Sequence, residues 1–371
     1  MRYFKNLIEQ LINPAGITIG GTNAWDVQVH DERLYQRIIN GGSLGLGESY
    51  MDGWWDCCAL DQFFYRLLSI DTDKRLGKNL ALLWGLLMAR LFNQQTPKKA
   101  TEVGLKHYDA GNTMFELMLD KYMMYSCGYW NDASTLDEAQ EKKLDLICRK
   151  LQLEPGQRVL DIGCGWGGFA RYAAEKYGVN VTGITISKEQ AALARERCQN
   201  FPVEIRLQDY RDIDQKFDRI VSIGMFEHVG YKNYHRFMQV ASRSLTDEGI
   251  FLLHCIGCRE SGVRTDPWIH KYIFPNGLIP SVIQVSKAIN NYFILEDWHN
   301  FGEYYDLTLM AWLKRFREAW PQIKHDYSEE FYRMWNYYLN LCAASFRARK
   351  NELWQLVLTK PQRQAMYMSV R

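Results

Sequence analysis

Apolar residues recur at helical spacing in a stretch that starts near residue 136. Four of them fall at i, i+3, i+4 and i+7. They are Leu144, Ile147, Cys148 and Leu151. Thr135 and Glu138, three residues apart, have the spacing of a capping box at the start of this pattern. The pattern therefore predicts a helix over about residues 136–151.

Short apolar runs alternate with helical segments after this helix. The runs predict strands at residues 158–162, 179–184, 205–208, 219–223 and 250–254. Alternation of strand and helix at this spacing is typical of a parallel sheet covered by helices on both faces. The predicted fold class is therefore α/β, a Rossmann-like doubly wound sheet.

The part of the chain before this pattern has a different character. Residues 1–92 contain short segments punctuated by glycine, including the run 41–47 (GGSLGLG), which predicts a turn-rich connection in a small accessory domain. Residues 93–105 begin with the polar, proline-broken segment NQQTPKK and predict a linker, so the second and larger domain would be 106–371. The apolar stretch 79–92 is shorter than the roughly 20 residues of a membrane span. A buried core helix is favoured there over an interfacial one.

Composition and charge narrow the class of protein. The chain has 371 residues, enough for two domains, and a net charge of only +2, which does not favour nucleic acid as a partner. The N-terminus lacks the apolar run and cleavage site of a secretory signal. The nine cysteines show no metal-ligand spacing, so no metal site is predicted and reduced thiols are expected. We expect a cytoplasmic protein.

The most informative short motif is VLDIGCGWGG at residues 159–168. An apolar strand ends near Asp161, and the glycines that follow let the backbone turn sharply against a ligand. The spacing differs from the GxGxxG of dinucleotide-binding folds, which remain the alternative. The stretch resembles motif I of class I methyltransferases, and this resemblance implies S-adenosylmethionine as the cofactor. The implied contacts in the loop are Asp161, Gly163, Gly165 and Gly167.

Further cofactor contacts are expected after the second and third strands. Thr185 stands where many relatives of this fold carry an acidic residue for the ribose, so Thr185 and Gln190 are candidates for that contact. Asp209 suits the adenine amino group, with Tyr210 nearby, although a solvated turn is the alternative for Asp209.

Five other stretches are more specific than the glycine loop. They are 106–112 (KHYDAGN), 125–130 (YSCGYW), 222–230 (SIGMFEHVG), 254–257 (HCIG) and 268–280 (WIHKYIFPNGLIP). Together they resemble the cyclopropane fatty acid and mycolic acid cyclopropane synthase family. Residues 45–57 resemble the extra N-terminal domain of its phospholipid-acting branch. The resemblance implies a transferase that adds a methylene to the double bond of a phospholipid acyl chain, with Tyr125 and Ser126 contacting the cofactor.

The resemblance also implies the base. In this family a bound bicarbonate is thought to deprotonate the carbocation formed on the acyl chain. The residues that would hold it here are Cys127, Glu227, His254, the backbone amide of Ile256, and Tyr305. Considered without their motifs, these residues have structural alternatives. Cys127 would be a small buried apolar residue, Glu227 a capping or pairing residue, and His254 a core histidine. His228 is expected to be structural.

Cys342 occupies the position of a C-terminal cysteine long suspected as a nucleophile in this family. It also belongs to an apolar stripe of helical period, which favours core or acyl-pocket lining. The stripe consists of Phe331, Met334, Trp335, Tyr338, Leu339, Cys342 and Phe346.

The expected partner is the acyl chain of a phospholipid at the membrane surface. Aromatic segments 231–237 and 312–320 are candidates to line an acyl tunnel. Candidate headgroup contacts are Arg264, Lys271, Lys287, Lys314, Arg315 and Arg317, for which an ordinary solvated face is the alternative. The family resemblance implies a homodimer bound peripherally to the inner face of the membrane. Two rival functions are a related acyl-chain methyltransferase with a methylated or hydroxylated product, and a non-catalytic lipid-binding protein.

Overall fold

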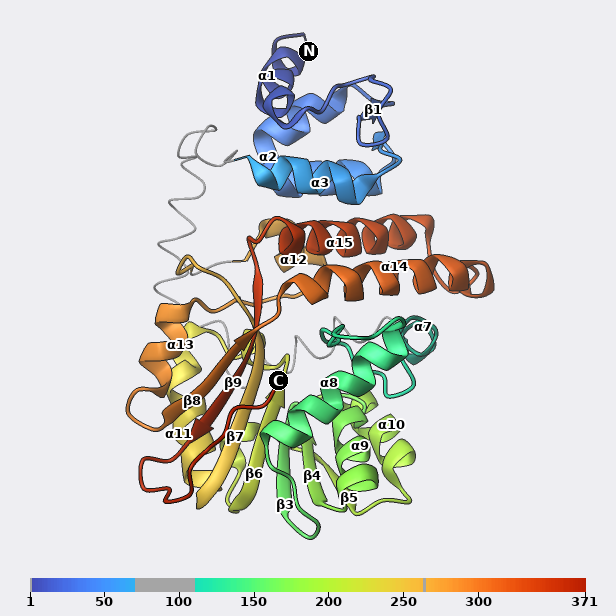
Figure 1. Ribbon diagram of the computed structural model, residues 1–371. Coiled ribbons are helices and arrows are strands. Elements are labelled where there is room, and N and C mark those ends of the chain that lie inside the picture. Colours follow the sequence, from blue (N-terminus) through green and yellow to red (C-terminus); the bar gives the residue numbers. More distant parts are fainter. Residues whose placement is uncertain (1, 71–110, 263–264) are drawn as a thin grey trace.

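The computed structural model describes residues 2–70, 111–262 and 265–371. The predicted apolar stretch 79–92 and the predicted linker 93–105 lie outside these residues. Within them, three parts are stacked along one direction (Figure 1). An α/β sheet with its helices lies at one end, a pair of long helices crosses above it, and the N-terminal helices lie on that pair.

Five of the strands match the sequence prediction closely. They are β3 (Arg158–Ile162), β4 (Asn180–Thr185), β5 (Val203–Leu207), β6 (Phe217–Ile223) and β7 (Leu245–Gly257). They pair in parallel in the order β5-β4-β3-β6-β7. The predicted doubly wound α/β class is confirmed.

The prediction of a purely parallel sheet is wrong at one edge. β9 (Glu352–Thr359) pairs antiparallel with β7, and β8 (Ile294–Asn300) pairs antiparallel with β9. The described sheet therefore has seven strands and is mixed. The chain leaves β8 into one long helix, α14 (Glu303–Ile323), and returns through a second, α15 (Glu329–Arg347), so it enters β9 at the end of the sheet where β8 finishes.

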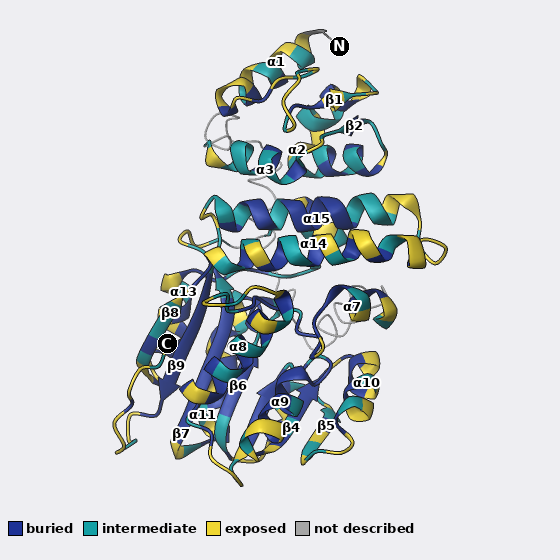
Figure 2. Cartoon of the chain, turned by 45° about the vertical axis from the view of Figure 1, so that its right-hand side comes forward, coloured by how far each residue is buried: buried dark blue, intermediate teal, exposed yellow. Residues whose placement is uncertain are grey.

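Neighbouring residues along the central strands face opposite cores, as buried strands require. Val159 packs with Leu144 and Ile147 of α8 (Leu136–Lys150) and with α9 (Gly168–Tyr177). Leu160 faces the other side, where α11 (Tyr234–Ser244) and α13 (Val282–Ile289) pack. Figure 2 shows these strands buried between the helices.

Helix α8 begins where the capping box was predicted. The Glu138 amide donates to Thr135 Oγ1 at 3.3 Å, and the Thr135 amide donates back to the Glu138 carboxylate at 3.2 Å. Helix α10 (Lys188–Cys198) packs beside β4 and β5, whereas α7 (Asn112–Met118) lies against the long helix pair and α12 (Pro267–Tyr272) against the N-terminal helices.

The N-terminal part is a small helical unit with a two-stranded ribbon. Its elements are α1 (Arg2–Ile12), β1 (Gln28–Val29), α2 (Arg33–Met51), β2 (Trp55–Asp56) and α3 (Leu60–Ser69). The glycine run 41–47, predicted to be a turn-rich connection, lies inside α2, so that prediction is wrong. The helix is interrupted at Gly42 (φ 55°, ψ −130°), and Gly47 lets it approach the ring of Trp268, where an added Cβ would lie 2.3 Å from the ring.

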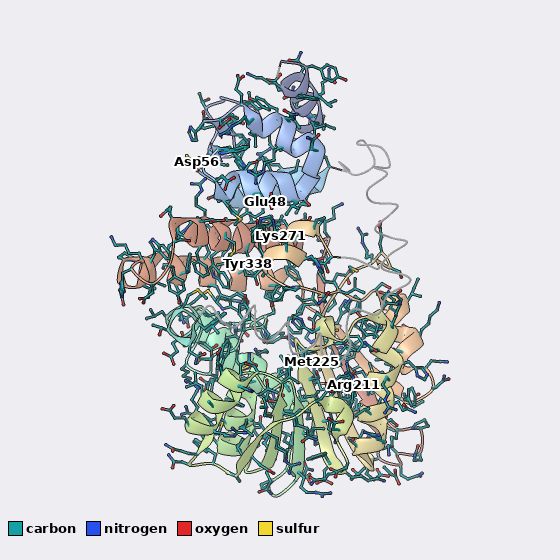
Figure 3. The ribbon with its side chains drawn as sticks, turned by 180° about the vertical axis from the view of Figure 1, so that it is seen from behind. Glu48, Asp56, Arg211, Met225, Lys271 and Tyr338 are labelled. Atoms are coloured by element: carbon teal, nitrogen blue, oxygen red, sulfur yellow. The ribbon has the colours of Figure 1, made fainter. Side chains whose placement is uncertain are left out.

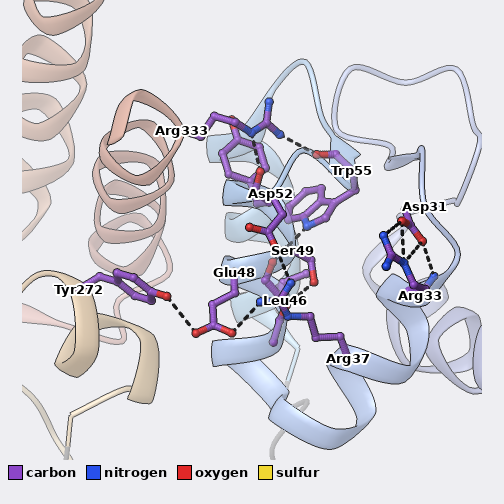
Figure 4. Close-up of polar contacts among 12 residues, drawn as sticks. Asp31, Arg33, Arg37, Leu46, Glu48, Ser49, Asp52, Trp55, Tyr272 and Arg333 are labelled. Atoms are coloured by element: carbon purple, nitrogen blue, oxygen red, sulfur yellow. Dashed lines mark hydrogen bonds and ion pairs between the residues drawn. The ribbon is translucent and has the colours of Figure 1, made fainter. Parts of the chain in front are cut away.

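The N-terminal unit packs on the long helices α14 (Glu303–Ile323) and α15. Arg347 of α15 joins Asp306 of α14 at 2.9 Å and Asp61 of α3 at 2.7 Å. Arg333 donates to the Asp56 carboxylate at 2.8 Å, and Tyr272 donates to Glu48 at 2.9 Å (Figure 4 shows the Arg333 and Tyr272 side chains). These contacts are partly buried, so they fix the unit over the helix pair.

Candidate active site

The glycine loop follows β3 at the carboxyl edge of the sheet, where parallel α/β folds bind ligands. Gly163, Gly165 and Gly167 all adopt positive φ, at 83°, 54° and 79°. The loop and the ends of β4 and β6 enclose a cavity that is lined mostly by apolar atoms. Met225 and Arg211 line it and lie below Tyr338 of α15 in Figure 3.

The cavity brings together every predicted cofactor residue except one. The residues that line it are Tyr125, Ser126, Asp161, Gly163, Gly165, Thr185, Gln190, Asp209 and Tyr210. Gly167 is the exception, because it faces α10, where an added Cβ would lie 2.8 Å from Cys198 Sγ. Its role in this structure is close packing of the loop on that helix.

Two features of this cavity suit a polar ligand with hydroxyl groups. Asp161 is buried, its Oδ2 has no hydrogen-bond partner within the described residues, and burial raises its pKa to about 7. Thr185 donates to Gln190 Oε1 at 3.0 Å and accepts from the Ser187 amide, so these polar groups are held in place at the end of β4. A hydroxyl or amine that contacts Asp161 would satisfy the orphan oxygen.

The wall formed by residues 123–126 is held by buried polar residues that the sequence analysis did not single out. Asp120 accepts from the Tyr122 and Met124 amides, both at 2.8 Å. Gln140 donates to the Ser126 carbonyl and Lys143 donates to Ser126 Oγ, both at 2.8 Å. Gln140 lies four residues before Leu144, on the apolar stripe of α8. A polar residue on a buried stripe was therefore the signal that marked this position.

The residues predicted to hold the anion come from the segment after Ser126, the turn after β6, strand β7 and helix α14. Glu227 follows β6, and its Oε1 accepts from the Ile256 amide of β7 at 2.6 Å. Its Oε2 is buried without a hydrogen-bond partner, and burial raises the pKa of Glu227 to about 7. His254 of β7 is also buried, and its Nε2 lacks a partner within the described residues. Glu227 Oε2 and His254 Nε2 are therefore two buried polar atoms without a hydrogen-bond partner among the described residues.

Cys127 and Tyr305 complete the predicted set. Thr308 Oγ1 of α14 lies 3.9 Å from Cys127 Sγ and accepts from the Gly128 amide at 3.0 Å, which joins this segment to α14. Burial raises the pKa of the Cys127 thiol far above its usual range, so the thiol stays neutral. Burial does the same to the Tyr305 hydroxyl, with a further contribution from the nearby Cys127 and Glu227.

Aromatic rings surround this region. Tyr125 packs on Trp312 at a centroid distance of 5.0 Å and donates its hydroxyl proton to Tyr338 at 2.9 Å. Tyr305 packs on Phe346 at 4.6 Å and edge-on to Trp312 at 6.0 Å. Ring faces of this kind stabilise a nearby positive charge. His228, expected to be structural, lines the cofactor cavity, and burial lowers its pKa to about 4.

Cys342 lies on α15 as the helical period predicted, within the stripe that includes Trp335 and Leu339. Its side chain is half-buried, and loss of solvation on burial raises the pKa of its thiol to about 12. A thiol with so high a pKa is a poor nucleophile near neutral pH, because the thiolate is the reactive form.

We therefore expect Cys342→Ala to keep at least about a third of the turnover, since it removes only packing atoms from the wall of the helix pair. The measurement is initial rate on vesicles of unsaturated phospholipid, with Cys258→Ala, on the half-buried Cys258 outside the cavity, as the control. A loss of more than a hundredfold with an unchanged melting temperature would instead assign the thiol a direct role.

Comparison with known proteins shows the family to which this chain is similar. A family model described as mycolic acid cyclopropane synthetase matches residues 95–356. A cyclopropane-fatty-acyl-phospholipid synthase of Escherichia coli strain K12 is 53% identical over 354 residues, which cover 95% of this chain and 93% of that protein. That match extends into the N-terminal unit.

Two solved structures share the fold of the catalytic part. A cyclopropane synthase from Mycobacterium tuberculosis has 34% identity and a TM-score of 0.67, covering 72% of this chain and all of that one. A mycolic acid cyclopropane synthase complexed with SAH and CTAB has 35% identity and a TM-score of 0.65, covering 69% and 97%.

The fold and the cofactor cavity define an S-adenosylmethionine-dependent methyltransferase. More narrowly, this chain belongs to the mycolic acid cyclopropane synthetase family. None of the helices in the described part of the chain has the length and apolarity needed to span a bilayer.

Proposed function

We propose that this chain transfers a methylene from S-adenosylmethionine to the cis double bond of unsaturated acyl chains in membrane phospholipids, forming a cyclopropane ring. The observation that carries the mechanism is the pair of buried orphan atoms, Glu227 Oε2 and His254 Nε2, beside the cofactor cavity. Bicarbonate bound by these groups would supply the base that removes a proton from the carbocation. The E. coli relative, a cyclopropane-fatty-acyl-phospholipid synthase by name, supports the choice of substrate.

The residues of the cavity fit the cofactor. The methyl group of S-adenosylmethionine is already activated on a sulfonium and is the one-carbon unit that the reaction requires. Gly163 and Gly165 allow the loop to lie close to the ligand, and Asp161 offers an oxygen for an amine or a hydroxyl. Asp209 and Tyr210, which also line the cavity, suit the adenine. Thr185 and Gln190 replace the usual acidic residue and suit the ribose.

The second group of residues fits a small oxyanion. The Ile256 amide donates to Glu227 Oε1, so a proton on the Glu227 carboxyl is directed to Oε2. With a pKa near 7, Glu227 is able to hold or release that proton near neutral pH. A protonated Oε2 would donate to one oxygen of the anion, and His254 Nε2–H and the Tyr305 hydroxyl are donors for the others.

The aromatic surroundings serve the cation and exclude water. Trp312, Tyr305 and Tyr125 present ring faces near the site. All three side chains are buried or half-buried, which limits the approach of water that would trap the carbocation as an alcohol.

We propose that the protein meets the membrane as a peripheral homodimer at the inner face. Of the predicted headgroup contacts, Arg315 donates to the Leu119 carbonyl and to Asp137, and Lys271 pairs with Glu48, so both are engaged within the protein. Lys287 is a better candidate. It lies on the exposed face of α13, one turn after Ile283, which is 56% exposed. Arg264 lies outside the described residues.

A test of the base is the dependence of the rate on bicarbonate. Initial rates would be measured with the purified protein, S-adenosylmethionine and unsaturated phospholipid vesicles in buffer freed of carbon dioxide. We expect turnover to be low in that buffer and to recover with added bicarbonate but not with added acetate or chloride. A rate that is the same in all these buffers would contradict the proposed base.

A further inference from the structure

Three strands place a row of polar side chains next to the proposed anion site. His254 of β7 lies directly opposite Gln355 of β9, which lies opposite His299 of β8. Gln355 is fully buried, and its neighbours in β9 are the apolar residues Trp354 and Leu356. A buried amide in an otherwise apolar strand has a desolvation cost, so it is expected to have a partner.

The partner of Gln355 is the histidine of the proposed site. Gln355 Nε2 lies 3.3 Å from His254 Nδ1, the ring nitrogen that faces away from the orphan Nε2. The Gln355 amide is oriented with its nitrogen toward the ring, which leaves Gln355 Oε1 buried without a partner among the described residues. In this orientation the amide nitrogen donates, so Nδ1 accepts and carries no proton. In a neutral imidazole the single ring proton is then on Nε2.

The charges around His254 keep the ring neutral. Burial, reinforced by the ammonium groups of Lys143 and Lys150, holds the pKa of His254 well below its usual range. Lys143 donates to Ser126 on the cofactor wall, and Lys150 pairs with Asp297 at 3.2 Å. Since the ring does not gain a second proton, its donor capacity depends on which nitrogen holds the first.

We propose that Gln355 is a positioning residue that fixes His254 as the neutral tautomer with its proton on Nε2, so that the ring presents a donor to the anion bound beside Glu227. This inference rests on the proposed function for its effect on the rate. In the other tautomer a lone pair on Nε2 would face the anion, and one hydrogen bond would be replaced by a repulsion.

The tautomer is measured directly by nitrogen NMR of the full-length protein labelled with ¹⁵N-histidine, with the His254 signals assigned by their loss in His254→Asn. In the unsubstituted protein we expect the proton on Nε2. In Gln355→Glu, a side chain of the same shape, the carboxylate accepts from the ring, so we expect the proton on Nδ1. Gln355→Met removes the hydrogen bond and should leave a mixture of the two tautomers.

The kinetic readout separates positioning from folding. We expect Gln355→Met to lower turnover by about 10- to 100-fold, a usual range for residues that orient a functional group. The KM for bicarbonate should rise, while the affinity for S-adenosylmethionine stays within about threefold. Gln239→Met, on the exposed face of α11, is the matched control and should change none of these values.

The outcomes distinguish the two proposals. A proton on Nε2 that is lost in Gln355→Glu, together with a rate that depends on bicarbonate, supports both the role of Gln355 and the proposed base. The same NMR result with a rate that is independent of bicarbonate supports the tautomer assignment and contradicts the proposed base. A proton on Nδ1 in the unsubstituted protein, or an unchanged tautomer in both variants, overturns the role of Gln355 whatever the bicarbonate dependence.

Discussion

Glu227→Gln is expected to lower turnover by about 100-fold or more, the lower part of the range for loss of a positioned acid–base group. The amide keeps the shape of the side chain, and its oxygen still accepts from the Ile256 amide, so the local fold is retained. It has no titratable proton to exchange with the anion. Affinity for S-adenosylmethionine should stay within about threefold, because Glu227 is outside the cofactor cavity.

The control is Glu189→Gln on the exposed surface of α10, which should keep full activity. Initial rates on unsaturated phospholipid vesicles and calorimetric binding of S-adenosylmethionine are the two measurements. Full turnover in Glu227→Gln would remove Glu227 from the mechanism.

The same substitution should stabilise the ligand-free protein, with a defined pH dependence. Burial raises the pKa of Glu227 from 4.5 to about 7, so the folded state binds this proton more tightly than the unfolded state. The contribution of Glu227 to stability is therefore fully present below pH 4.5 and falls as the pH rises toward 7. Glutamine does not titrate. The free energy of unfolding of the variant, relative to that of the parent, should therefore increase by about 3 kcal/mol as the pH rises through this range. Urea unfolding between pH 4.5 and 8 measures this difference, and a constant difference would contradict the assigned pKa.

The second large effect is expected in the glycine loop. Gly165 lines the cavity, has φ 54°, and an added Cβ there would meet no protein atom within 4 Å. Asparagine tolerates this left-handed conformation, so Gly165→Asn should fold normally while its side chain occupies space beside the cofactor. We expect the Kd for S-adenosylmethionine to rise about 30-fold or more, which is about 2 kcal/mol.

Gly156 offers a matched control for this substitution. It also has positive φ, at 84°, and no atom within 4 Å of an added Cβ, but it lies in the exposed turn before β3 and away from the cavity. Gly156→Asn should melt at the same temperature as Gly165→Asn and bind the cofactor normally. Equal affinity in the two variants would show that the loop does not lie against the cofactor.

The sequence predicted the central parallel strands, because their apolar runs and the intervening helices follow simple periods. It did not predict the antiparallel edge, in which β8 precedes and β9 follows the two long helices, since alternation of strand and helix indicates only parallel neighbours. The glycine run in α2 misled the prediction because two of its glycines, Gly45 and Gly47, serve close packing. Gly47 packs against Trp268, a contact between residues distant in sequence.

Most cofactor residues were predictable because they lie at or after the ends of predicted strands, whereas Tyr125 and Ser126 came from the family resemblance; all but Gly167 line the cavity. The supporting residues were not found in the same way. Lys143 and Gln355 act through contacts to Ser126 and His254, which only the folded arrangement brings near. The signal that the sequence did carry was a polar residue in a buried apolar pattern, as Gln355 is within β9.

The most direct test of the central claim is mass spectrometry of the acyl chains after reaction with S-adenosylmethionine carrying a fully deuterated methyl group. The reaction mixture also contains unsaturated phospholipid vesicles and the purified protein. Ring formation predicts that each product chain gains one carbon and retains two of the three deuterium atoms, with fragments diagnostic of a ring. Retention of all three deuterium atoms, or gain of an oxygen atom, would show that the cation is not closed to a ring and would contradict the proposed function.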